Sequence, residues 1–109
     1  MPALSGGEAT KGAGEIVRTK PAGTSALVVG QNALSTSAEM VIAANPNRRC
    51  LELVNTDGTI SMYVGPTAGV LTTTGYLLKA GVVVRMEGYT GPIYAIAASG
   101  TPSISFMEW

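Results

Sequence analysis

The side chains best suited to recognition in this sequence include two adjacent arginines. Arg48 and Arg49 follow a turn and open a short alternating run of apolar and polar residues. Guanidinium groups make forked contacts to carboxylates, which suits them to interfaces between subunits. Two interpretations stay open. The pair is an anchor between subunits, or it is a solvated strand start at which one arginine pairs with a nearby carboxylate such as Glu52 or Glu87.

Aromatic residues form the second candidate group. The chain has four tyrosines and a single tryptophan. Tyr89, Tyr94 and Trp109 join the two arginines as candidate interface residues, because aromatic rings bury a large area and keep a polar tip. With Tyr63 and Tyr76 they could also form a platform for a sugar, although most of them lie at strand ends or beside turns, where ordinary packing is the alternative.

The sequence offers little for catalysis. Histidine, the commonest general base and metal ligand, is missing. The carboxylates of Glu39, Glu52, Asp57, Glu87 and Glu108 lie on separate segments, with no spacing that pairs them. Cys50 has no histidine partner to make it a thiolate. We therefore expect no enzyme activity, no catalytic residues, no cofactor and no metal site.

Composition limits the partners. The 109 residues include seven basic and seven acidic side chains, for a formal net charge of zero, and only 13% are charged. A neutral chain does not favour a nucleic-acid groove or a polybasic membrane surface. A surface with so few charges is poorly solvated, so we expect other chains to cover part of it.

Short alternating segments, separated by Gly, Pro, Asn and Asp, run through most of the chain. This pattern is typical of half-buried β-strands bounded by turns. The expected strands are Ala26–Val29, Glu39–Ala43, Cys50–Val54, Ile60–Val64, Tyr76–Lys79, Val82–Glu87, Ile93–Ala97 and Ser103–Trp109. No helical segment is expected between them, which argues against parallel βαβ units.

The sequence Asp57-Gly58 predicts a tight turn, because glycine accepts positive φ at no steric cost. We therefore expect Leu51–Val54 and Ile60–Val64 to pair as a hairpin. Alternation within the first of these strands predicts that Leu51 and Leu53 are buried and that Glu52 faces solvent.

Residues 25–109 are expected to form one domain, preceded by an extended or flexible N-terminal arm over residues 1–24. The arm has few strongly apolar side chains, so it stays disordered or orders only against a neighbouring subunit. About seven or eight short antiparallel strands predict an all-β fold, a small β-sandwich of jelly-roll or Greek-key type. A closed barrel is the alternative.

Several motifs between residues 38 and 109 resemble a known family. They are Asn45-Pro-x-Arg-Arg-x-Leu-x-Leu-x-Asn55, Met62-Tyr-Val-Gly65, Gly75-Tyr-Leu-Leu-x-x-Gly81, Tyr89-Thr-Gly-Pro-Ile-Tyr-Ala-Ile-Ala97, and Ser99-Gly-Thr with a closing Glu108-Trp109. Together they resemble a small β domain of tailed-bacteriophage virion proteins, found in capsid decoration (cement) proteins and in modules of head or tail fibres.

The resemblance implies a structural virion protein that binds the outer capsid shell and stabilises it. Its partners would be the major capsid protein and copies of itself, as a dimer or trimer, with no nucleic acid and no membrane. It would be made in the host cytoplasm and reside on the capsid surface. The alternative is a receptor- or glycan-binding module of a phage head or tail fibre.

Overall fold

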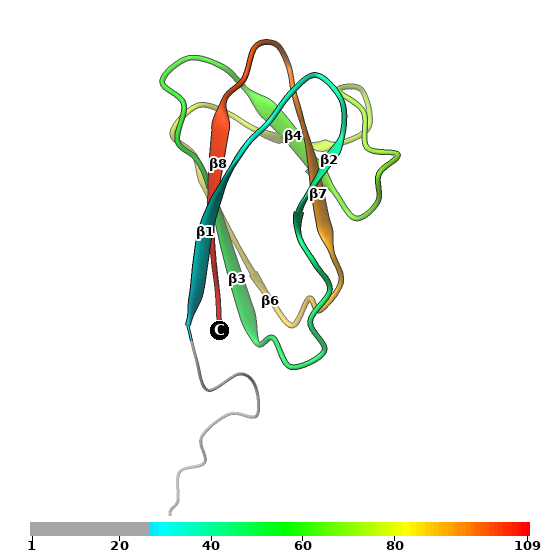
Figure 1. The fold of residues 1–109 in the computed structure, drawn as a ribbon, viewed down its shortest axis with the longest axis vertical. Coiled ribbons are helices and arrows are strands. Elements are labelled where there is room, and N and C mark those ends of the chain that lie inside the picture. Colours follow the sequence, from blue (N-terminus) through cyan, green and yellow to red (C-terminus); the bar gives the residue numbers. More distant parts are fainter. Residues whose placement is uncertain (1–26) are drawn as a thin grey trace, which may run out of the picture.

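A computed structural model describes residues 27–109, which form eight strands in two sheets (Figure 1). The arm predicted over residues 1–24 lies outside the described residues. The strands are β1 (Val28–Ala33), β2 (Glu39–Ile42), β3 (Cys50–Asn55), β4 (Met62–Gly65), β5 (Tyr76–Leu78), β6 (Val83–Glu87), β7 (Ile93–Ala97) and β8 (Ser103–Glu108). Among these residues there is no helix long and apolar enough to cross a membrane.

Two four-stranded sheets face each other in this fold. The first sheet has the order β1-β8-β3-β6 and the second has the order β2-β7-β4-β5, with every pairing antiparallel. Figure 1 shows β1, β8, β3 and β6 on one side and β2, β7 and β4 on the other. The all-β sandwich prediction is therefore confirmed, and the closed-barrel alternative is excluded.

Side chains that alternate along the strands fill the space between the sheets. Leu51 and Leu53 of β3 are completely buried, as predicted, and Ile104 of β8 is buried beside them. Met62 of β4 and Ala95 of β7 meet them from the second sheet. Each fully buried Leu or Ile side chain stabilises the fold by about 1.5–3 kcal/mol relative to an exposed one.

The first strand extends further than the sequence predicted. β1 continues to Ala33, whereas the sequence predicted a strand that ends at Val29 and a loop from residue 31. Polar residues at 31 and 32 suggested the loop, but their backbone pairs with β8 in register, with Gln31 opposite Ser105. Pairing with a neighbouring strand outweighs the weak strand propensity of these residues.

The predicted hairpin between Leu51–Val54 and Ile60–Val64 is wrong. β3 belongs to the first sheet and β4 to the second, so the chain crosses between the sheets here. The buried side chain of Asn55 supports this crossing, because its amide nitrogen donates to Ile60 O at 2.8 Å and to Leu78 O at 2.9 Å. These two bonds join the end of the first sheet to the second.

Asp57 shapes the same crossing. Its carboxylate accepts the backbone N–H of Ile60 at 2.6 Å and that of Thr59 at 2.9 Å. These bonds hold the pKa of the Asp57 carboxyl below its usual value of 3.8, and the bond from Ile60 has the largest effect. Gly58 does not have positive φ, which among the described glycines occurs at Gly81, Gly88 and Gly100. An Asp-capped loop therefore replaces the expected tight turn.

Candidate functional site

Four of the five predicted interface residues gather at one end of the sandwich, where β3 begins and β8 ends. Arg49 N–H and Cys50 N–H both donate to Trp109 O, and the Arg48 guanidinium reaches the Tyr89 carbonyl. Tyr94 lies elsewhere, on β7, with its side chain on the outer face of the second sheet because its neighbours Ile93 and Ala95 are buried. The structure thus groups Arg48, Arg49, Tyr89 and Trp109 and leaves Tyr94 apart.

Arg48 is a buried structural cation, not a solvated residue at a strand start. Its side chain has 0% exposure, and Nε lies 2.6 Å from Glu108 Oε1. This corrects the predicted pairing of an arginine with Glu52 or Glu87. The other nitrogens donate to three backbone carbonyls, those of Ala43, Tyr89 and Gly91. Arg48 therefore has no exposed side-chain surface within the single domain, whereas the Arg49 side chain is exposed.

Glu108 was not predicted as the partner of Arg48, although the sequence contains a signal for it. Ile104, Phe106 and Glu108 are spaced by two residues, so a single strand face carries all three. Ile104 is fully buried, and Phe106 packs against the same core. A carboxylate on a buried face needs a cation within reach, and Arg48 supplies it across 60 residues of chain.

The pair of Arg48 and Glu108 positions the loop between β6 and β7. Arg48 Nη1 donates to Tyr89 O at 3.1 Å and to Gly91 O at 2.8 Å, and the Tyr89 hydroxyl donates to Pro92 O at 2.6 Å. The Tyr89 ring packs directly over Gly91, where a Cβ atom would lie 2.5 Å from the Tyr89 hydroxyl oxygen. The arginine thus fixes where the Tyr89 side chain points.

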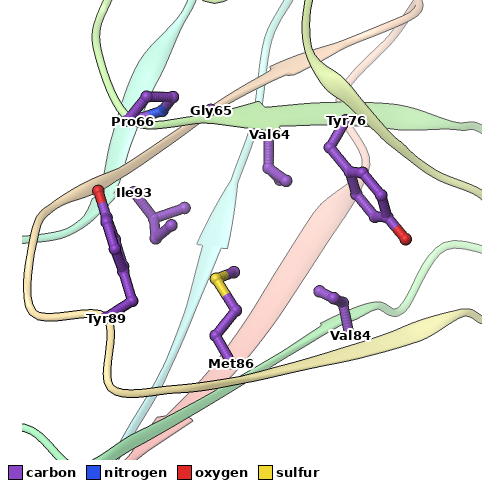
Figure 2. Close-up of a pocket in the computed structure, with 8 residues that line it drawn as sticks. All are labelled: Val64, Gly65, Pro66, Tyr76, Val84, Met86, Tyr89 and Ile93. Carbon is purple, nitrogen blue, oxygen red and sulfur yellow. The ribbon is translucent and has the colours of Figure 1, made fainter.

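Tyr89 forms one end of an apolar cleft between the two sheets. The cleft has a volume of about 500 Å³ and opens at the side of the sandwich formed by β5 and β6. Its lining residues are Val64, Gly65, Pro66, Tyr76, Val84, Met86, Tyr89 and Ile93. Figure 2 shows Tyr89 and Tyr76 at opposite ends, with the side chains of Val64, Val84 and Met86 between them.

The cleft lies where the edge strands of the two sheets differ in length, three residues in β5 and five in β6. β5 pairs with β4 through only three residues and ends the second sheet with Tyr76 opposite Val64. β6 ends the first sheet and directs Val84 and Met86 toward the core, but only part of these side chains is covered. In the sequence, Val84 and Met86 alternate with Val83, Arg85 and Glu87, but this pattern does not show that the strand lies at an open edge.

The chemistry of the cleft is that of a binding surface. None of its lining residues carries a charge, and its polar groups are the hydroxyls of Tyr76 and Tyr89 and the backbone. Residues 27–109 also contain no group of three or more His, Cys, Asp or Glu side chains that could hold a metal ion. The cleft can receive apolar side chains or molecules, but its lining offers no acid–base pair.

A charged strip lies on the outer face of β6, beside the cleft. Arg85 Nε is 3.6 Å from Glu87 Oε2, and both side chains are more than half exposed. The Arg85 guanidinium also lies 5.3 Å from the centre of the Trp109 ring, within the range of a cation–π contact. This contact joins Trp109 to the edge of the first sheet.

Comparison of the chain with protein-family models and with curated proteins finds no match. The fold and the site together define an all-β sandwich with an apolar cleft at one side. The buried ion pair of Arg48 and Glu108 holds the Tyr89 loop at one end of this cleft.

Proposed function

We propose that the chain is a structural virion protein of a tailed bacteriophage, a capsid decoration (cement) protein that binds and stabilises the outer shell. The motifs between residues 38 and 109 support this role through their resemblance to phage β domains. We also infer that the strand orders β1-β8-β3-β6 and β2-β7-β4-β5 are those of a jelly roll, a fold used in viral capsid domains.

The apolar surface is the observation on which the proposal rests. Large apolar side chains between 40% and 65% exposed are spread over both sheets and their edges: Leu27, Val28, Val29, Met40, Leu71, Tyr76, Leu77, Val82 and Val83. Each of these side chains has apolar surface that a bound protein can cover, at a gain of about 25 cal/mol for each Å² buried. With only 13% charged residues in the chain, this surface favours a protein that works inside an assembly.

The proposed mechanism is mechanical. Copies of the domain bind the major capsid protein across junctions between capsomers and bury apolar side chains there. A ligand that binds the intact shell but not the ruptured one stabilises the shell by mass action. An interface of at least about 1,000 Å² is needed for stable attachment. No catalytic step is part of this role.

Binding to shells tests the proposal. Purified protein added to expanded shells that lack it should co-sediment with them and raise the temperature at which they rupture, measured by calorimetry. A Val29→Asp variant should bind more weakly, because Val29 is 65% exposed on the outer face of β1. Gln31→Asp, on the same face of the same strand, is the matched control. Failure of the unchanged protein to bind expanded shells would refute the proposal.

The second candidate function is a receptor- or glycan-binding module of a phage head or tail fibre. The position of the tyrosines favours it: Tyr76 is 62% exposed at the end of the cleft, and Tyr63 and Tyr94 share the outer face of the second sheet. Binding to a glycan array that is lost in Tyr76→Ala or Tyr94→Ala would support it. An array without signal, together with even labelling of the whole capsid in micrographs, would exclude it.

A further inference from the structure

Among residues 27–109, no strand pairs with the outer edge of β6, so its backbone groups there are without a strand partner. β6 pairs with β3 on one side only and ends the first sheet. Gly88 N–H donates to Arg49 O, and Asn55 N–H donates to Val82 O. Even-numbered residues of this segment therefore direct their backbone toward β3. In an antiparallel ladder the odd-numbered residues, Val83, Arg85 and Glu87, then direct their N–H and C=O groups outward.

Edge strands of this kind accept another strand unless something blocks them. β2 has an irregular register between Met40 and Ile42, and β5 is only three residues long, so both edges of the second sheet offer little to pair with. β6 has five residues in a regular register with β3. Its two charges have opposite signs and lie two residues apart, at Arg85 and Glu87.

We propose that β6 pairs with β6 of a second copy of this chain, antiparallel, around a twofold axis at Met86. In this register Arg85 of each copy lies opposite Glu87 of the other, and Met86 lies opposite Met86. The Arg85–Glu87 positions have outward backbone groups, so they form hydrogen-bonded pairs on both sides of the axis. Opposite charges directly across two strands stabilise the pairing.

Alternative registers around a twofold axis are less favourable. Pairing centred on Arg85 places two arginines directly opposite each other, and like charges in that position destabilise a sheet. Pairing centred on Val84 places Arg85 opposite Val83 and leaves the charges without partners. Gly88, with φ of 83°, ends the strand and prevents a register shifted further toward the C-terminus. The charges therefore select the register centred on Met86.

The same pairing covers the open side of the cleft. Val84 and Met86 line the cleft from β6, so the side chains that the second copy directs inward meet the same apolar space. Figure 2 shows Val84 between β6 and Tyr76, and Tyr76 is 62% exposed at this end of the cleft. A flexible methionine suits such an irregular gap. Backbone bonds supply affinity and the cleft supplies specificity, as in other cases of strand addition.

A charge exchange tests the pairing. The oligomeric state of the full chain is measured by sedimentation equilibrium over a range of concentrations. We expect a dimer that Arg85→Glu and Glu87→Arg each weaken by roughly tenfold, and that the double variant restores. Lys79→Glu makes the same charge change at an exposed site outside β6 and should leave the dimer unchanged. The contact of Arg85 with Trp109 is lost in both the single Arg85→Glu and the double variant, so it cannot explain a rescue.

Cross-linking tests the register directly. Opposed residues without mutual backbone bonds have Cα atoms about 4.5 Å apart, within the roughly 4.4–6.8 Å that a disulfide spans. In a Cys50→Ser background, Met86→Cys should form a disulfide-linked dimer under mild oxidation. Val84→Cys, which faces the same cleft but lies opposite Gly88 of the second copy, should not. Trp109 fluorescence checks that each variant is folded.

A monomer at every concentration would overturn the proposal, as would a double charge variant that stays as weak as the single ones. Cross-linking through Val84→Cys in place of Met86→Cys would overturn the register. These measurements use the free protein, so they do not depend on the virion role. A dimer that fails to bind shells would refute only the capsid proposal, and a monomer that binds them would refute only the pairing.

Discussion

Replacing Arg48 tests whether the buried ion pair supports the end of the sandwich. In Arg48→Ala, Glu108 keeps only a long contact to Asn45 Nδ2 at 3.4 Å. The carbonyls of Ala43, Tyr89 and Gly91 lose their donors at the same time. Because Glu108 is buried, water does not readily replace the lost partner. We expect a large loss of stability and a displaced Tyr89 loop.

The magnitude follows from the kind of contact that is lost. Removing one partner of a buried ion pair costs about 3–5 kcal/mol, because an uncompensated charge remains. A domain of this size has a total free energy of unfolding of about 4–12 kcal/mol. The variant is therefore expected to lose about a quarter or more of its free energy of unfolding. Its Tm should fall by at least about 12 °C, at about 4–8 °C for each kcal/mol.

Urea unfolding followed by the fluorescence of Trp109, the single tryptophan, measures this loss. Arg49→Ala is the matched control, because Arg49 is exposed and its removal should change stability by no more than about 0.5 kcal/mol. Arg48→Met combined with Glu108→Met should cost less than the sum of the two single changes, since neither charge is left alone. The reasoning fails if Arg48→Ala and Arg49→Ala differ by less than about 1 kcal/mol.

Two further predictions concern the loops. Gly91→Ala should destabilise the domain by about 1–3 kcal/mol in urea unfolding, because its Cβ would lie 2.5 Å from the Tyr89 hydroxyl oxygen. Gly58→Ala, with open space around it, should have little effect, and equal losses in both would contradict the packing argument. Asp57 has a lowered pKa in the folded state, so its ionised carboxylate stabilises the fold. This contribution to the free energy of unfolding is complete above the ordinary pKa of 3.8 and is lost as the pH falls through the pKa of the folded state. The difference in Tm between the unchanged protein and Asp57→Asn should therefore be largest above that pH and shrink in acid; a difference that stays constant would show that the charge is not involved.

The positions of the strands were largely predictable from the sequence. The predicted strand Ile93–Ala97 matches β7, and the others differ mostly by one or two residues at their ends. Leu51 and Leu53 were predicted to be buried and are completely buried. Period-two alternation is a local property of an extended chain, so it is visible without any knowledge of neighbouring strands.

The candidate site was only partly predictable. Arg48 was singled out from its type and its place beside Arg49, but its burial and its bond to Glu108 depend on β3 and β8 lying side by side. The cleft was not predicted. Its apolar residues look like ordinary core positions in the sequence, and only the ends of the two sheets leave Val84 and Met86 partly uncovered.

By itself, the sequence determined the all-β class, the approximate strands and the buried face of β3. Only the tertiary structure decided which strands are neighbours. The Asp57-Gly58 pair favoured a local hairpin, yet Asn55 bonds to both Ile60 and Leu78 and sends the chain into the other sheet. The physical reason is that alternation specifies a buried face but not the strand that lies beside it. Pairings such as β1 with β8 join opposite ends of the domain, and they are selected by the packing of the whole core.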